Sequence, residues 1–73
     1  MMLTPRTKIA VDMAHAADVL KDISNKTTEM LVQFDWKGVQ ITLYRSGSMH
    51  FYHFIDVPLG KRYAEEILAH VRG

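Results

Sequence analysis

The 73-residue sequence contains no cysteine. It therefore has no disulfide, and it offers no thiolate for zinc binding, redox chemistry or nucleophilic catalysis. No apolar run approaches the roughly 20 residues that span a bilayer. The first residues, Met-Met-Leu-Thr-Pro-Arg, also lack the long apolar stretch of a signal peptide. We therefore expect a cytoplasmic protein that does not enter a membrane.

The chain also lacks a strong excess of charge, since its net charge is only +1. Dedicated nucleic-acid-binding domains usually carry a basic stripe, so this balance counts against that function. The apolar fraction of 48% is that of an ordinary globular protein. We expect one domain over residues 1–73. A core of this size is small enough that many such folds depend on a partner subunit.

Apolar residues occupy every second position in three segments, residues 30–36, 39–44 and 49–55. Lys37-Gly38 separates the first two, and Arg45-Ser46-Gly47-Ser48 separates the last two, as expected of turns. This pattern predicts a three-stranded antiparallel meander with one buried face. The predicted buried set is Met30, Val32, Phe34, Trp36, Val39, Ile41, Leu43, Met49, Phe51, His53 and Ile55.

The two ends of the chain predict helices. Leu59, Tyr63, Ile67 and Val71 form one apolar stripe after a potential cap at Asp56. A shorter stripe covers residues 16–23. Upstream, residues 7–14 fit either a strand or the start of one longer helix, and the β-branched residues there favour a strand. The expected fold is α+β in the order β-α-β-β-β-α, with helices on one face of an antiparallel sheet; the alternative is α-β-β-β-α.

This element order, together with residues 41–49 (Ile-Thr-Leu-Tyr-Arg-Ser-Gly-Ser-Met) and the amphipathic helix that follows, resembles one half-repeat of the TATA-box-binding protein. In that family two repeats form a saddle whose concave sheet face lies on the DNA minor groove. The resemblance implies a homodimer here, with Tyr44, His50 and Tyr52 facing the groove and Lys8 on the first strand. Asp12 and Asp35 would bring negative charge to the same face.

Under the alternative order, the chain is similar to the double-stranded-RNA-binding domain. The last helix of that family opens with a Lys-Lys-x-Ala-Lys phosphate grip, and residues 61–65 here read Lys-Arg-Tyr-Ala-Glu. The final lysine of the grip is replaced by Glu65.

No catalytic or metal-binding pattern is evident. His50 and His53 fall on opposite faces of a predicted strand, and His15 and His70 fall on separate helices, so none forms a chelating pair. Ser46 and Ser48 lie in a turn without a local base to activate them. We therefore expect no enzyme activity, no metal, no cofactor and no small-molecule substrate.

The outward set of the predicted sheet mixes apolar, aromatic and amide side chains, which is typical of a contact surface. We expect a binding module that uses this face, as a homodimer, and the alternative is a nucleic-acid-binding protein. Leu31 and Phe54 belong to the outward set. The predicted binding residues are Gln33, Gln40, Thr42, Tyr44, His50, Tyr52 and Lys8.

Overall fold

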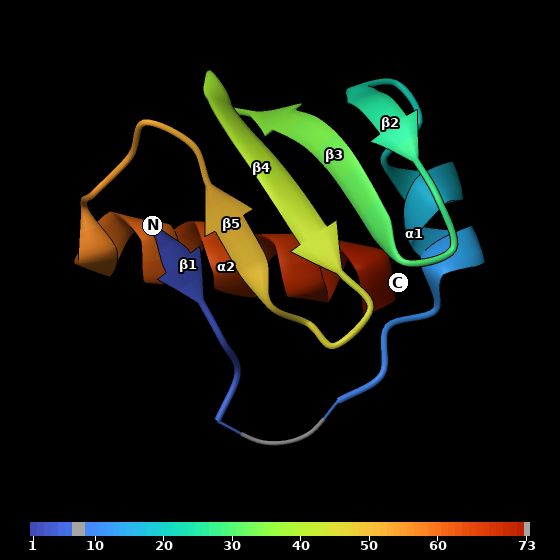
Figure 1. Cartoon of the computed structure of the whole chain (residues 1–73), viewed down its shortest axis with the longest axis horizontal. Coiled ribbons are helices and arrows are strands. Elements are labelled where there is room, and N and C mark those ends of the chain that lie inside the picture. The colour runs from blue at the N-terminus through green and yellow to red at the C-terminus, as the bar shows by residue number, and fades with distance from the viewer. Residues whose placement is uncertain (7–8, 73) are drawn as a thin grey trace.

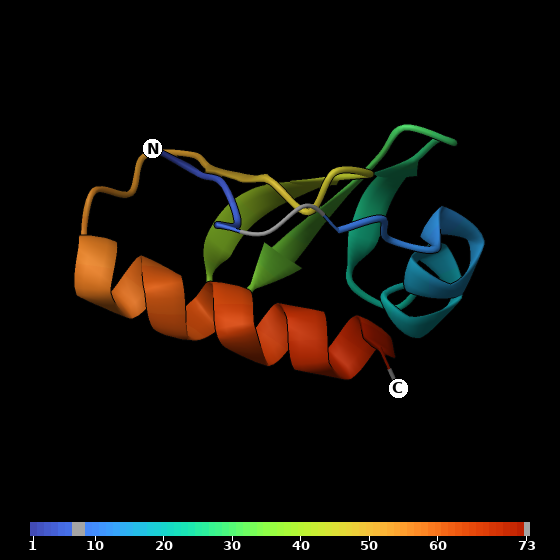
Figure 2. The ribbon, with the colours of Figure 1, turned by 90° about the horizontal axis from the view of Figure 1, so that it is seen from below.

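The computed structural model of the chain describes residues 1–6 and 9–72. It is an α+β protein in which five antiparallel strands form one open sheet in the order β1-β5-β4-β3-β2. Both helices lie on the same side of this sheet, with the longer one running across most of its width (Figures 1 and 2). The elements are β1 (Met2–Leu3), α1 (Met13–Val19), β2 (Ser24–Thr27), β3 (Leu31–Trp36), β4 (Val39–Tyr44), β5 (Met49–Phe51) and α2 (Val57–Arg72).

The predicted meander is confirmed as β3, β4 and β5. Lys37 and Gly38 join β3 to β4 with φ angles of 52° and 83°, and two such positive values are characteristic of a tight type I′ hairpin turn. The Asp35 carboxylate accepts the Gly38 N–H at 3.0 Å and so closes the turn. β5 is shorter than predicted, because the chain turns at Tyr52 and His53. His53 has a φ of 53° and is exposed, so its predicted place in the buried set is wrong.

The N-terminal prediction is wrong in its placement of the first strand. Residues 9–12 form neither strand nor helix, and they are held to the sheet by the Val11 N–H, which donates to the Arg45 carbonyl at 2.9 Å. Residues 7 and 8 of the predicted strand lie outside the described residues. The first strand is instead Met2–Leu3, which pairs with β5. A continuous helix from residue 5 is excluded as well, because the Asp12 carboxylate caps α1 by accepting the His15 N–H.

A further strand, β2, was not predicted. It pairs with β3 through a register shift between Ser24 and Lys26, which is a β-bulge at the sheet edge. The observed order is therefore β-α-β-β-β-β-α. Neither predicted order contains this polar edge strand.

The core lies between the sheet and the two helices. The inward alternation is confirmed at six positions that are 0–1% exposed. Met30 and Ile55 are exceptions, since they are 59% and 88% exposed, and Trp36 is only half-buried. The predicted cap of the last helix is confirmed, because the Asp56 carboxylate accepts the Leu59 N–H at 3.1 Å. The buried apolar residues are Met13, Ala16, Leu20, Val32, Phe34, Ile41, Leu43, Met49, Phe51, Ile67 and Val71.

α2 is also tied to the β3–β4 turn by polar contacts. The Lys37 ammonium lies 3.0 Å from a Glu66 carboxylate oxygen and 5.3 Å from the centre of the Tyr63 ring. The Trp36 indole N–H donates to the same carboxylate oxygen at 3.4 Å. Within residues 1–6 and 9–72, no helix combines the length and the apolar character that crossing a bilayer would require.

The Glu66 contacts predict a pH-dependent stability. The hydrogen bond from Lys37 lowers the pKa of the Glu66 carboxyl, and the bond from Trp36 adds to this effect against partial desolvation. A carboxyl whose pKa is lowered by folding stabilises the protein above its unfolded-state pKa, and this contribution is lost as the pH falls through the folded-state pKa. We expect Glu66→Gln to lower the urea midpoint at neutral pH and to leave it nearly unchanged at a pH below both pKa values.

Glu65→Gln is the matched control, because Glu65 is exposed and makes no hydrogen bond or ion pair to any described residue. It should change the midpoint little at either pH. A Glu66→Gln effect of equal size at both pH values would contradict an ionic origin.

Candidate binding face

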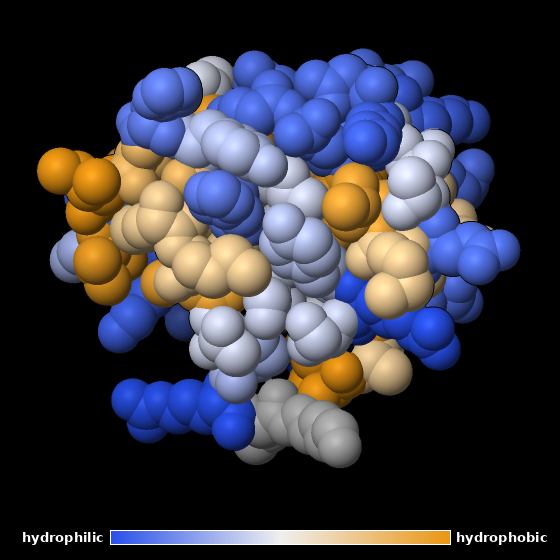
Figure 3. Space-filling view, in the orientation of Figure 1, coloured by the Kyte–Doolittle hydropathy of each residue, from blue (hydrophilic) through white to orange (hydrophobic). Residues whose placement is uncertain are grey.

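The face of the sheet opposite the helices is open, and it is the surface turned toward the viewer in Figure 3. The strand register aligns one residue from each strand in a row across it. Met2 lies beside His50, His50 beside Thr42, Thr42 beside Gln33, and Gln33 beside Lys26. This row runs from the β1 edge to the β2 edge and forms the centre of the face.

Residues on either side of this row complete the face. Leu31 and Tyr44 are partners near one end of the β3–β4 hairpin, and Asp35 and Gln40 are partners near the other. Tyr52 lies beyond β5, but its N–H donates to the Gln40 carbonyl at 3.0 Å. This backbone contact holds Tyr52 beside the sheet after the strand has ended.

Four side chains on this face form an ordered layer, which we call the aromatic–amide layer: Gln33, Thr42, His50 and Tyr52. The Gln33 amide donates to the Thr42 hydroxyl at 3.4 Å, and this hydroxyl donates to the Tyr52 hydroxyl at 3.1 Å. The His50 and Tyr52 rings stack with centres 4.2 Å apart and an interplanar angle of 25°.

Thr42 shows how closely this layer is packed. It is only 2% exposed, although it lies on the face that no helix covers. Its burial therefore comes from its neighbours on the face. A side chain held by hydrogen bonds and ring stacking loses little conformational entropy when a partner binds, so the layer is preorganised for contact.

The structure thus brings together Gln33, Thr42, His50 and Tyr52 of the predicted binding residues. Gln40 adjoins Tyr52 through the backbone contact, and Tyr44 lies at the other end of β4. Lys8 lies outside the described residues. Met2 and Lys26 were not predicted to lie on this face, because neither belongs to a predicted strand.

Two further expectations about this face are corrected. Phe54 was assigned to the outward set, but its ring lies 5.7 Å from that of buried Phe51 and 6.0 Å from that of Tyr63 on α2. Asp12 caps α1 instead of lying on the sheet, so it brings no negative charge to the face. Asp35 does lie in the outward register, opposite Gln40. The central row carries a single charged residue, Lys26. Figure 3 shows pale, weakly polar residues down the middle of the face, with strongly hydrophilic residues above and beside them.

The four histidines lie in different surroundings. His50 is stacked on Tyr52, and the His70 ring lies 6.1 Å from Trp36. His15 and His53 are exposed. Among residues 1–6 and 9–72, no three histidine, aspartate or glutamate side chains lie close enough to hold a metal ion.

Comparisons with known proteins add no further evidence on what the face binds. The chain gives no match to a protein-family model, to a curated protein or to a solved structure.

Proposed function

We propose that the protein is a non-enzymatic binding module whose contact surface is the open sheet face. The observation that carries this proposal is the aromatic–amide layer, because Gln33, Thr42, His50 and Tyr52 are held in place on a face that no helix covers. Tyrosine and histidine rings combine a large contact area with a polar group, which suits recognition surfaces. A solvated face would not require such fixed side chains.

We further propose that the protein forms a homodimer through the edge of β1. The two sheet edges differ in how they are protected against pairing. β2 carries a bulge and a lysine, which are features that prevent edge-to-edge association. β1 has neither, Met2 on it is 53% exposed, and no described strand pairs with its outer edge. An antiparallel β1–β1 pair would join two sheets into ten strands.

The area that such a dimer needs is available next to β1. A typical interface buries about 800 Å² on each partner, and the whole chain exposes 4863 Å². A two-residue strand is too small to supply this area alone. The loop after β5 adds Ile55, which is 88% exposed, and the first residue of α2 adds Val57, which is 45% exposed. This loop adjoins β1, since the Met1 amino group donates to the Phe54 carbonyl at 3.3 Å.

This arrangement corresponds to the saddle expected from the resemblance to the TATA-box-binding protein, and a fold of that type is part of the proposal. The support comes from three features: β1 at one edge of the sheet, both helices on one face, and a terminal helix across the back of the sheet. In the dimer the two aromatic–amide layers would share one continuous open face.

The homodimer is tested by the mass of the protein in solution. Light scattering at micromolar concentration should give twice the chain mass for the wild type, and Met2→Lys should shift it toward the monomer by placing a charge at the β1 edge. Met30→Lys is the matched control, because Met30 is equally exposed at 59% but lies in the β2–β3 connection. A strictly monomeric wild type at these concentrations would contradict the dimer.

Nucleic acid is the second candidate partner, and the stacked His50 and Tyr52 rings favour it. Base stacking on an aromatic ring contributes about 1–3 kcal/mol per base. A gel shift at low salt with duplex DNA, single-stranded DNA and RNA should then detect binding that weakens as salt rises. Tyr52→Ala should weaken binding about 5-fold to 150-fold, and Lys26→Gln should reduce the salt dependence. No shift at low salt would exclude this partner.

A further inference from the structure

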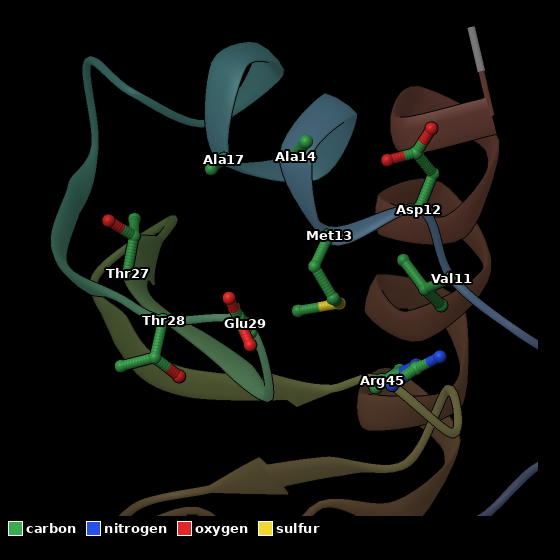
Figure 4. Close-up of a pocket in the computed structure, with 9 residues that line it drawn as sticks. All are labelled: Val11, Asp12, Met13, Ala14, Ala17, Thr27, Thr28, Glu29 and Arg45. Atoms are coloured by element: carbon green, nitrogen blue, oxygen red, sulfur yellow. The ribbon is translucent and has the colours of Figure 1, made fainter.

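A second site lies away from the sheet face. A hollow of about 560 Å³ opens between α1, the β2–β3 turn and the turn after β4. This volume falls within the range of about 300–1,000 Å³ that is typical of small-molecule sites. Figure 4 shows its lining from three sides, with α1 on one side and the two turns facing it. We call this hollow the α1 cleft.

The floor of the α1 cleft is apolar. Met13, a core residue that is 8% exposed, forms the bottom of the cleft, and Ala14 and Ala17 line it from α1 (Figure 4). Val11 closes the side next to Asp12. Because the two alanine side chains are short, an aliphatic group can approach the helix closely and contact the thioether of Met13.

The rim carries one cation and one anion that are free to bind. Arg45 comes from the turn after β4, and Glu29 comes from the β2–β3 turn, where its side chain points toward Met13 (Figure 4). Both are exposed, and neither side chain makes a hydrogen bond or ion pair within the described part of the chain. The other polar groups are engaged: the Asp12 carboxylate caps α1, and the Thr28 hydroxyl accepts two backbone N–H groups.

Arg45 is also anchored at its backbone, which fixes the geometry of the cleft. Its N–H donates to the Met30 carbonyl at 3.0 Å, and its carbonyl accepts the Val11 N–H at 2.9 Å. These two bonds join the turn after β4 to the β2–β3 turn and to the segment that precedes α1. The guanidinium therefore extends from a fixed point beside the apolar floor, and its planar donors match a carboxylate.

We propose that the α1 cleft binds a free amino acid with an apolar side chain. The carboxylate of the ligand pairs with Arg45, its ammonium pairs with Glu29, and its aliphatic side chain lies against Met13, Ala14 and Ala17. Arg45, Glu29 and the apolar floor are complementary to these three groups in a single hollow, whose second carboxylate, Asp12, already caps α1. This site is separate from the open sheet face and does not depend on the proposed binding function.

The test is an NMR titration of the ¹⁵N-labelled protein with L-leucine. We expect saturable shifts of the amides of Ala14, Ala17 and Arg45, with a Kd on the order of 1 mM, as suits a ligand of few atoms. Leucinamide, which lacks the carboxylate, and N-acetyl-leucine, which lacks the ammonium, should each bind about twofold to fivefold more weakly, since exposed ion pairs contribute little each.

Two variants assign each charge to its partner. Arg45→Gln should lower the affinity for leucine to that for leucinamide, and it should leave leucinamide binding unchanged. Glu29→Gln should lower the affinity for leucine to that for N-acetyl-leucine, and it should leave N-acetyl-leucine binding unchanged. Tyr52→Ala on the sheet face should leave leucine binding unchanged. The proposal is overturned if about 20 mM leucine, far above that Kd, causes no shifts, if the shifts lie outside the cleft, or if the three compounds bind equally.

Discussion

Phe51→Ala is expected to lower the free energy of unfolding by about 3–5 kcal/mol, which is the usual loss for a buried phenylalanine. Phe51 is fully buried, and it pairs with Ile41 across the sheet and stacks on Phe54. A domain of this size often has only about 3–5 kcal/mol of total stability. A large part of the variant should therefore be unfolded near room temperature even without urea. Far-UV circular dichroism of the variant in the absence of urea, compared with a urea titration of the wild type, measures the loss.

His50→Ala is the matched control, because His50 is the preceding residue of β5 and faces the open side. It loses only its stacking on Tyr52, so we expect a change of about 1 kcal/mol or less. Equal losses for the two variants would contradict a sheet that is buried on one face only. A large loss for Phe51→Ala alone would locate the folding energy on the helix side and leave the open face free for binding.

The three central strands could be predicted because their alternation reflects this one-sided burial. Every second residue faces the helices, namely Val32 and Phe34 on β3 and Ile41 and Leu43 on β4, and the intervening residues face outward. The sequence itself therefore shows apolar residues at a period of two. The Lys37-Gly38 turn is equally local. Both residues adopt positive φ, and a glycine between two apolar alternations is a strong hairpin signal.

The two edge strands could not be predicted in this way. β1 contains two residues, and its position depends on pairing with His50 and Met49 at the far end of the chain. β2 consists of Ser-Asn-Lys-Thr and is mostly exposed, so no buried face marks it as a strand. Ile9 and Val11 have strand-forming side chains, but in the structure they pack beside the turn after β4 instead of pairing in the sheet.

The open sheet face and the α1 cleft also differ in how far they could be predicted from the local sequence pattern. The outward positions of Gln33, Thr42 and His50 follow directly from the alternation of their strands. In the α1 cleft, the nearness of Arg45 to the β2–β3 turn likewise continues the β3–β4 register, in which Leu31 pairs with Tyr44. The helical wall of the cleft does not follow from this pattern, because the segment before α1 reaches Arg45 through the bond from the Val11 N–H to the Arg45 carbonyl, between residues distant in sequence.

Gly47→Ala is expected to lower the free energy of unfolding by about 2–5 kcal/mol, through two separate effects. Gly47 has a φ of +90°, where a side chain costs about 1–2 kcal/mol. An added methyl group would also clash with the Cδ1 atom of Ile9, and it would lie 2.6 Å from the Cγ1 atom of Ile9 and 3.3 Å from the Cγ atom of Pro5. Because the Ile9 side chain cannot move its Cδ1 and Cγ1 atoms away together without changing rotamer, this overpacking adds about 1–3 kcal/mol.

Gly38→Ala separates the two effects. Gly38 has a similar φ of +83°, but an added methyl group there meets no atom within 4 Å, so we expect a loss of about 1–2 kcal/mol from the backbone alone. Urea titrations of both variants measure the difference. In an Ile9→Ala background, the cost of Gly47→Ala should fall toward that of Gly38→Ala, since the clash with Ile9 has been removed and only the contact with Pro5 remains. Equal costs in the wild-type background would show that Ile9 does not pack over Gly47, and the position of residues 9–12 beside the turn would have to be revised.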